Sequence, residues 1–463
     1  MPQSAGKKRF HLKAPNLLVL IFLMILLASL LTYVVPAGQF DLDQSGSLIT
    51  GTYHAVAQSP VNPWQAVCRI FDGLVANAWV ISIVLLMGGA IGAILSTGAV
   101  EELMGFATYR LKDKGLYVLI PICMYLMSFL SALGGSDAFV AFVAVGIVFA
   151  RKLRLDPIAA VAIFFMSSFV GFFSGPFCMT AQIIAGVTPL SGFVLRLVWL
   201  LVSSTVCVLY TVRYCARVAK DPAKSLMGGT SWLDACDRPS DALRAVPFRP
   251  RSAVVVLLLF GTFIFVTVGI MTIGWGYAQF AAAMMLLLIV CGIIYRMGPN
   301  AIADAFAKGV MSMSFVAVVI GMAKAISLVL EDGNILHTLI NGVTTPLSSV
   351  PQGVATVLMF LSNLIINIFI PSGSGQAAVV LPLMCPIGDL LGIPRQVVVS
   401  AFVYGDGLTN LCIPTFGALM GALGMAKVPF GRWLRFVFPF VLLMFLVNSV
   451  LLFVLTAIGW TGM

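Results

Sequence analysis

Runs of about twenty consecutive apolar residues recur along this chain, and they constrain its fold more than any other feature. Such a run, wound as a helix, spans a hydrocarbon core of about 30 Å. Of the 463 residues, 60% are hydrophobic and 10% are charged, whereas soluble domains average about 25% charged residues. The sequence therefore predicts an all-α, polytopic membrane protein in the lipid bilayer. The predicted apolar segments are Ala14–Val35, Val75–Thr97, Leu116–Ala150, Pro157–Phe173, Leu190–Val212, Ala253–Thr272, Tyr277–Tyr295, Val310–Leu330 and Leu434–Leu455.

The polar composition excludes several classes of function. The net charge is +10, but the basic residues cluster just outside apolar runs, as the positive-inside rule requires, so we expect no nucleic-acid partner. The nine cysteines form no CxxC pair and the three histidines are scattered, so we expect no metal site of these residues. No GxxxxGK[ST] motif occurs, which disfavours an ATP-driven pump unless a separate subunit supplies the ATPase. We expect no catalytic residues and no cofactor.

The basic residues also predict the topology. Ala14–Val35 is longer than the apolar region of a signal peptide and lacks a cleavage site, so we expect a retained helix with a cytoplasmic N-terminus. Eight basic residues mark 213–252 as a cytoplasmic linker, and the uncharged C-terminus is expected outside. The predicted parts are a first repeat at 1–212, the linker at 213–252, a connecting helix at 253–275 and a second repeat at 276–463.

Two polar, glycine-rich bends interrupt the apolar pattern and resemble each other. They are Ser131–Asp137 and Ile370–Gln376, and the arms that return from them, Ala138–Ala150 and Ala377–Asp389, have thirteen residues each. At 1.5 Å per residue, such an arm spans only about 20 Å and cannot cross the bilayer. Each segment is therefore predicted to be a re-entrant hairpin whose tip stops within the membrane.

Each predicted hairpin is followed by a span that helix breakers interrupt. The breaks are Ser174–Phe177 and Asn410–Pro414, and proline there removes a backbone donor and splits the helix. The segments before the hairpins also correspond, since Ser96–Ala99 matches Glu331–Asn334 about 235 residues later. The charge pattern places the two hairpins on opposite sides of the membrane. This arrangement predicts two inverted repeats with a substrate site where their broken segments meet.

The bends contain the candidate binding residues. A returning half-helix presents its N-terminus, whose N–H groups and dipole favour an anion such as a carboxylate. Asp137 and Asp406 are acids inside predicted spans, where they can bind a substrate cation, Na⁺ or a proton, or make structural hydrogen bonds. Lys324 fits either an internal ion pair or a side chain that extends to the membrane surface. Asn363 and Asn367 fit either a cavity wall or helix–helix hydrogen bonding. The candidate substrate- or ion-binding residues, with Na⁺ considered at the tips, are Gly134, Gly135, Ser136, Asp137, Ser372, Gly373, Ser374, Gly375, Gln376, Asp406, Thr409 and Asn410.

These motifs resemble the YfcC-type proteins, candidate basic amino acid antiporters in the family named after anaerobic C4-dicarboxylate carriers. The resemblance implies the ion-transporter superfamily fold, with a scaffold, a moving domain that contains both hairpins, and a homodimer formed through the scaffold. The chain departs from the family pattern in one motif. The family has two adjacent glutamates where this chain has Asp137 and Ala138. The resemblance covers nearly the whole chain and rests on Val34–Phe40, Met87–Gly92, Pro371–Ala377, Arg395–Gln396, and Gly405–Asn410 before Pro414–Thr415.

Three functions fit these features. The first is a secondary transporter of an amino acid, such as arginine or ornithine, by antiport or by coupling to Na⁺ or H⁺, in a bacterial cytoplasmic membrane. The second is a C4-dicarboxylate carrier, which needs a second anion site and tolerates buried acids poorly. The third is a channel or a membrane-embedded enzyme. Two acids near the predicted site favour the substrate that bears an amine.

Overall fold

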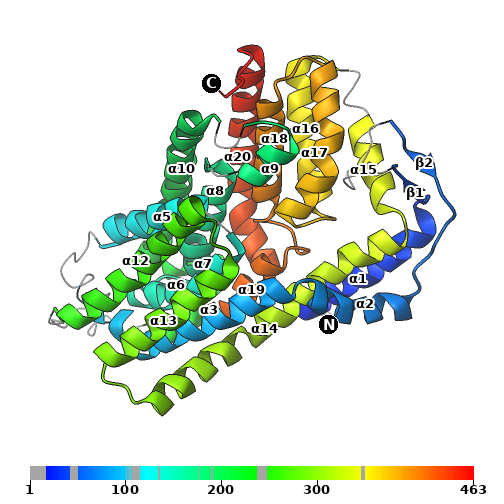
Figure 1. Ribbon diagram of the computed structural model, residues 1–463. Helices are drawn as coiled ribbons and strands as arrows, with labels where there is room; N and C mark the ends of the chain where they lie inside the picture. The colour runs from blue at the N-terminus through cyan, green and yellow to red at the C-terminus, as the bar shows by residue number, and fades with distance from the viewer. Residues whose placement is uncertain are drawn as a thin grey trace, which may run out of the picture.

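The computed structural model describes residues 17–41, 51–100, 102–103, 106, 115–133, 136–176, 178–188, 191–236, 248–345 and 350–462. Within these ranges the chain is almost entirely helical (Figure 1). The exception is a two-stranded antiparallel ribbon, in which β1 (Gly38–Gln39) pairs with β2 (His54–Ala55). The predicted all-α class is confirmed apart from this ribbon.

The helices follow the predicted apolar runs closely. The first half contains α1 (Leu17–Val34), α2 (Pro63–Ala76), α3 (Ala78–Ser96), α5 (Gly115–Leu133), the 3₁₀ helix η2 (Ser136–Phe142), α6 (Val143–Lys152), α7 (Pro157–Val161), the π-helical η3 (Ala162–Met166), α8 (Ser167–Ser174), α9 (Met179–Ile184) and α10 (Phe193–Lys220). The second half contains η4 (Pro222–Lys224), η5 (Ser231–Ala235), α12 (Pro250–Ile273), α13 (Tyr277–Ile294), α14 (Pro299–Asp332), α15 (Leu336–Thr344), α16 (Gln352–Asn367), α17 (Gly373–Leu390), α18 (Arg395–Thr409), α19 (Gly417–Met425) and α20 (Phe430–Ala457).

Several helices are suited to a membrane in both length and surface. Within the described residues, five helical stretches are long and apolar enough to cross a bilayer. On α20, Leu442, Leu446, Val450 and Phe453 lie on one side and are at least half exposed. An apolar stripe of this kind is unfavourable in water and favourable against lipid. The five stretches are Ala78–Ser96, Pro157–Ser174, Phe193–Lys220, Pro299–Asp332 and Phe430–Ala457.

The same order of elements occurs twice along the chain. In the first half, α5 is followed by η2 and α6, the continuous α7–η3–α8 helix ends at Ser174, and α9 and α10 follow. In the second half, α16, α17, α18, a break, α19 and α20 follow in the same order. In Figure 1, α16, α17, α18 and α20 stand side by side. The predicted order of helices and breaks is therefore present, while the re-entrant hairpins and the inversion of one half relative to the other stay predictions.

The helix α14 packs against α3 through glycines. A Cβ atom on Gly92 would lie 2.6 Å from the Gly309 Cα atom, and one on Gly309 would lie 2.7 Å from the Gly89 carbonyl oxygen. Only residues without a side chain permit this approach, which is how helices pack closely within membranes. The Met87–Gly92 motif is thus a packing surface. Figure 1 shows α14 running alongside α3.

The segment Val34–Phe40 joins the first helix to the end of α14. The Gly38 N–H group donates to the Asn334 carbonyl oxygen at 2.9 Å, and the Gln39 side chain donates to the Asn334 side chain at 2.6 Å. The N–H group of Phe40 donates to Nδ1 of His337 in α15. The motif therefore ties the ribbon to α14 and α15 at one end of the molecule.

Four element boundaries differ from the sequence-based prediction. The helix α14 begins at Pro299 rather than near Val310, and α10 and α12 extend into the predicted linker 213–252. The helix α17 has 18 residues and begins at Gly373, so part of the predicted bend belongs to its first turn. At 1.5 Å per residue it spans about 27 Å, longer than the predicted arm. The depth of the hairpins in the membrane stays a prediction.

Candidate functional site

The tip of the second hairpin is a short extended segment between α16 and α17. Ser372 has φ −146° and ψ 111°, and its hydroxyl oxygen accepts a hydrogen bond from the Gly375 N–H group at 3.4 Å. Serine is a preferred N-cap because this bond satisfies one N–H group of the first helical turn. Pro371 disfavours helical backbone in the residue before it. The Ile370–Gln376 sequence therefore ends one helix and starts the next.

Gly373 allows the tip to approach Asp406 of α18. A Cβ atom at Gly373 would lie 2.8 Å from Asp406 Oδ2, closer than Cβ atoms pack in proteins. The Asp406 carboxylate thus lies at the N-terminal end of α17, where the helix dipole favours a negative charge. Asp406 is 1% exposed, so its charge is largely removed from solvent. The tip and the acid predicted from sequence form one site.

Amide side chains hold Asp406 in place. The Asn410 amide nitrogen donates to Asp406 Oδ1 at 2.9 Å. The Asn367 amide nitrogen donates to Asn410 Oδ1 and to the Asp406 carbonyl oxygen, both at 2.8 Å. This network joins the end of α16 to the break after α18. Asn367 therefore makes hydrogen bonds between helices, from α16 to the end of α18.

Two other candidates support the tip from behind. Gln376 is fully buried, and its amide nitrogen donates to the carbonyl oxygen and the Oδ1 atom of Asn363, at 3.1 and 3.2 Å. The Thr409 hydroxyl donates to the Gly405 carbonyl oxygen at 2.7 Å. Neither residue contributes to the cavity wall described below. The Gln376 contact holds α17 against α16, whereas the Thr409 bond lies within α18.

A cavity of about 340 Å³ opens in front of the second tip. Its wall is formed by the α2–α3 junction, the end of α8 with α9, the α14 helix, the α17 tip and the α18–α19 break. The Thr415 hydroxyl is buried in this wall with no hydrogen-bond partner among the described residues, and such a group is usually satisfied by a ligand or by water. The polar wall residues are Asn77, Cys178, Thr180, Lys324, Ser327, Ser372, Asp406, Asn410 and Thr415.

The sequence-based prediction did not include one wall of this cavity. Lys324 and Ser327 come from α14, and Asn77 separates α2 from α3 and donates to the Ile320 carbonyl oxygen at 3.4 Å. Lys324 is the one charged residue within the apolar run Val310–Leu330. A lone charge in a membrane span is the signal that could have identified this wall.

The first hairpin is described only in part. Gly134 and Gly135 lie outside the described residues. Ser136 and Asp137 begin η2, and Ser374 lies in the first turn of α17, but the description of these three residues does not extend to their side chains. Their roles in binding therefore stay predictions.

Comparison with known proteins identifies the family. Residues 14–457 match the family described as C4-dicarboxylate anaerobic carriers. The chain belongs to this family. It is therefore a membrane-embedded transport protein.

The relatives of this carrier match it over nearly their whole length. YfcC of Escherichia coli (strain K12), named as a candidate basic amino acid antiporter, is 30% identical over 94% of this chain and 95% of its own. An uncharacterised protein of Haemophilus influenzae (strain ATCC 51907 / DSM 11121 / KW20 / Rd) is 26% identical over 97% of this chain and 98% of its own.

Two solved transporter structures are similar at low sequence identity. The YdaH transporter of Alcanivorax borkumensis has a TM-score of 0.46 and 19% identity, over 97% of this chain and 100% of that chain. MtrF of Neisseria gonorrhoeae, described with a class of antimetabolite efflux pumps, has a TM-score of 0.45 and 17% identity, over 95% of each chain.

Proposed function

We propose that this carrier is a secondary transporter of an amino acid and that the cavity beside Asp406 is its substrate site. The observation that carries the proposal is a buried carboxylate in the cavity wall, held between the second tip and the second break. An acid in a low-dielectric site favours a cationic group as its ligand, because an opposite charge compensates its desolvation. The substrate's ammonium or guanidinium group, as in arginine or ornithine, is that ligand.

A C4-dicarboxylate fits this wall less well. A dianion beside Asp406 would be repelled, and it would need two cationic partners. Among the described wall residues, Lys324 is the one cationic side chain. The N-terminus of α17, which offers partial positive charge, already faces Asp406. The cavity therefore favours a substrate that bears an amine.

The proposed transport cycle follows from the repeated order of elements. The hairpins and broken spans move as one body, as inverted repeats, relative to a scaffold of α1, α3 and α13. Two such proteins associate through the scaffold in a bacterial cytoplasmic membrane, with the N-terminus inside and the C-terminus outside. A Na⁺ or H⁺ gradient, or exchange for a second substrate, drives the cycle. The orphan Thr415 hydroxyl supports a cation site near the second break.

Uptake into proteoliposomes tests the proposal. Purified carrier is reconstituted and given radiolabelled arginine, ornithine, neutral amino acids and C4-dicarboxylates, each under Na⁺, H⁺ or exchange gradients. We expect accumulation of an amino acid, which Asp406→Asn abolishes while the protein remains folded. The matched control is Asp304→Asn, an exposed acid of α14, which should leave uptake unchanged. Uptake of dicarboxylates alone, or normal uptake by Asp406→Asn, would contradict the proposal.

A further inference from the structure

The cavity has charges of opposite sign on two different helices. Among its described wall residues, the charged side chains are Asp406 of α18 and Lys324 of α14. Lys324 has 27% of its side chain exposed although it lies within an apolar span. A lysine at this depth is costly unless it has a partner or a ligand. The cavity thus presents one positive and one negative group to whatever occupies it.

The ion-pair partner of Lys324, Glu331, holds it only weakly. Its Nζ atom lies 3.9 Å from Oε1 of Glu331, two turns further along α14, and the Glu331 side chain is 47% exposed. An ion pair that is this long and this exposed contributes little to stability. Lys324 can therefore exchange Glu331 for another carboxylate at small cost.

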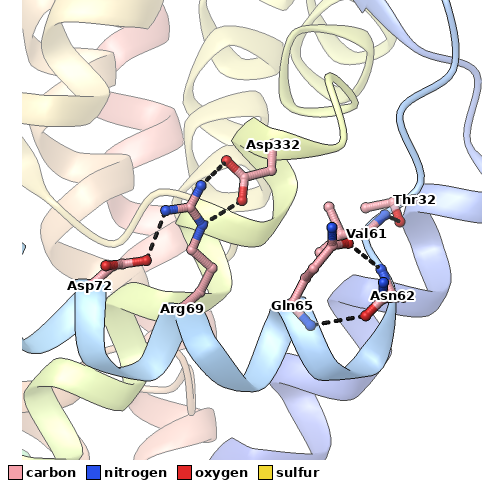
Figure 2. A network of polar contacts seen from close by, with 7 residues as sticks. All are labelled: Thr32, Val61, Asn62, Gln65, Arg69, Asp72 and Asp332. Carbon is pink, nitrogen blue, oxygen red and sulfur yellow. Dashed lines mark hydrogen bonds and ion pairs between the residues drawn. The ribbon is translucent and has the colours of Figure 1, made fainter.

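The neighbouring acids are already bound. Figure 2 shows Arg69 of α2 between Asp332, which it binds through two hydrogen bonds of 2.5 and 2.8 Å, and Asp72, at 2.8 Å. This bidentate arrangement is the stronger kind of ion pair. It leaves Glu331 as the acid that the structure pairs with Lys324.

The helix α14, which carries Lys324, is fixed against α2. A Cβ atom on Gly73 of α2 would lie 2.3 Å from the Gly321 carbonyl oxygen and 2.9 Å from the Ala325 nitrogen, so the two backbones are in direct contact. Lys324 lies between Gly321 and Ala325 in sequence. Its backbone is thus held beside the cavity, and only its flexible side chain needs to move.

We propose that Lys324 binds the carboxylate of a zwitterionic substrate while Asp406 binds its ammonium group. This proposal rests on the amino acid transport function given above and names the substrate class: a molecule with one carboxylate and at least one cationic amino or guanidinium group. The α17 N-terminus is faced by Asp406, so the substrate carboxylate pairs with the lysine across the cavity. Glu331 holds Lys324 when the cavity is empty, and the substrate replaces it.

The test compares ligands with and without a carboxylate on purified protein. Equilibrium binding is measured for an amino acid that the wild type binds and for the amine that its decarboxylation would give. The wild type should bind the amino acid roughly tenfold or more tightly than the amine, the size expected for a charge-assisted interaction. In Lys324→Gln this preference should disappear while the affinity for the amine is retained or increased, because a like charge is removed from the cavity. Lys324→Arg should retain most of it.

Three further variants separate binding from structural effects. Lys308→Gln, an exposed lysine on the same helix, should behave as the wild type. Glu331→Gln removes the competing acid and should tighten amino acid binding. The double variant Lys324→Gln with Glu331→Gln restores the local charge balance and should lose the preference as the single lysine variant does.

Two results would overturn the proposal. One is an unchanged preference for the carboxylate in Lys324→Gln. The other is a loss of preference in Glu331→Gln equal to that in the lysine variant, because Lys324 would then act only through its pair with Glu331. If the wild type instead binds dicarboxylates and no amino acid, the proposed function itself fails, and this outcome is distinct from both.

Discussion

Gly373 is the point where the second hairpin tip meets Asp406, and Gly373→Ala is the sharpest perturbation of this contact. The added Cβ atom would lie 2.8 Å from Asp406 Oδ2 and 3.5 Å from Phe172 Cζ. Asp406 cannot easily yield, because its Oδ1 atom is bonded to Asn410, which is bonded in turn to Asn367. The substitution must therefore displace either the start of α17 or the acid.

The cost follows from the geometry. An ordinary contact begins at 3.4 Å, so the atoms must separate by about 0.6 Å, and overpacking of this kind typically costs about 1–3 kcal/mol. We expect a loss of that size in the free energy of unfolding. We also expect substrate affinity to fall by about tenfold or more, because the displaced carboxylate lines the cavity.

The assay pairs thermal unfolding in detergent with equilibrium substrate binding on the same preparation. The control is Gly261→Ala in α12, where a Cβ atom would meet nothing within 4 Å. Alanine is the better helix former, so this control should match or exceed the wild-type stability. A Gly373→Ala protein with wild-type melting temperature and affinity would refute the assignment of the tip–acid contact to the site.

Three other predictions concern stability. Arg69→Gln leaves Asp332 without its bidentate partner. Because the pair is partly exposed, the free energy of unfolding should fall by about 1 kcal/mol. An unchanged melting temperature would show that the pair contributes nothing to stability. Burial lowers the pKa of His337 below its ordinary 6.5, so the fold favours the neutral ring that accepts the Phe40 N–H group. That contribution is complete above the unfolded pKa and is lost as pH falls from there through the lower folded pKa. Relative to its intrinsic rate, amide exchange at Phe40 should therefore become less protected below about pH 6.5, and His337→Gln should abolish this pH dependence. Asp156→Ala should cost about 2–4 kcal/mol in chemical or thermal unfolding, because a buried carboxylate that caps α7 also accepts two hydroxyl hydrogen bonds; a cost below 1 kcal/mol would contradict this.

The sequence predicted those helices whose position is determined by an apolar run alone. It missed α2, which has 14 residues and contains Arg69 and Asp72, so the segment does not resemble a membrane span. It placed the start of α14 too late because Asp304 and Lys308 interrupt the apolar pattern, although alanines make that segment a good helix. A criterion based on the length of apolar runs does not detect the charged ends of long helices.

The residues around the cavity were predicted on one side only. The bend and the Asp406 motif were recognised together because polar, glycine-rich interruptions stand out against apolar runs. The glycines also misled, since Gly373 was assigned to the bend although the Ser372 cap starts α17 there. The opposite wall depends on how α14 packs against α2 and α3, which local sequence does not specify. In the sequence, the single charge of Lys324 within an apolar run was the one indication of this opposite wall.

The most direct test of the account is a cryo-electron microscopy structure of the purified carrier with a saturating amino acid that it transports. The account predicts density for the ligand in the cavity between α14, the α17 tip and the α18–α19 break. Its amino group should lie within hydrogen-bond distance of Asp406, and its carboxylate should face Lys324. Ligand density elsewhere, with this cavity unoccupied, would contradict the central claim.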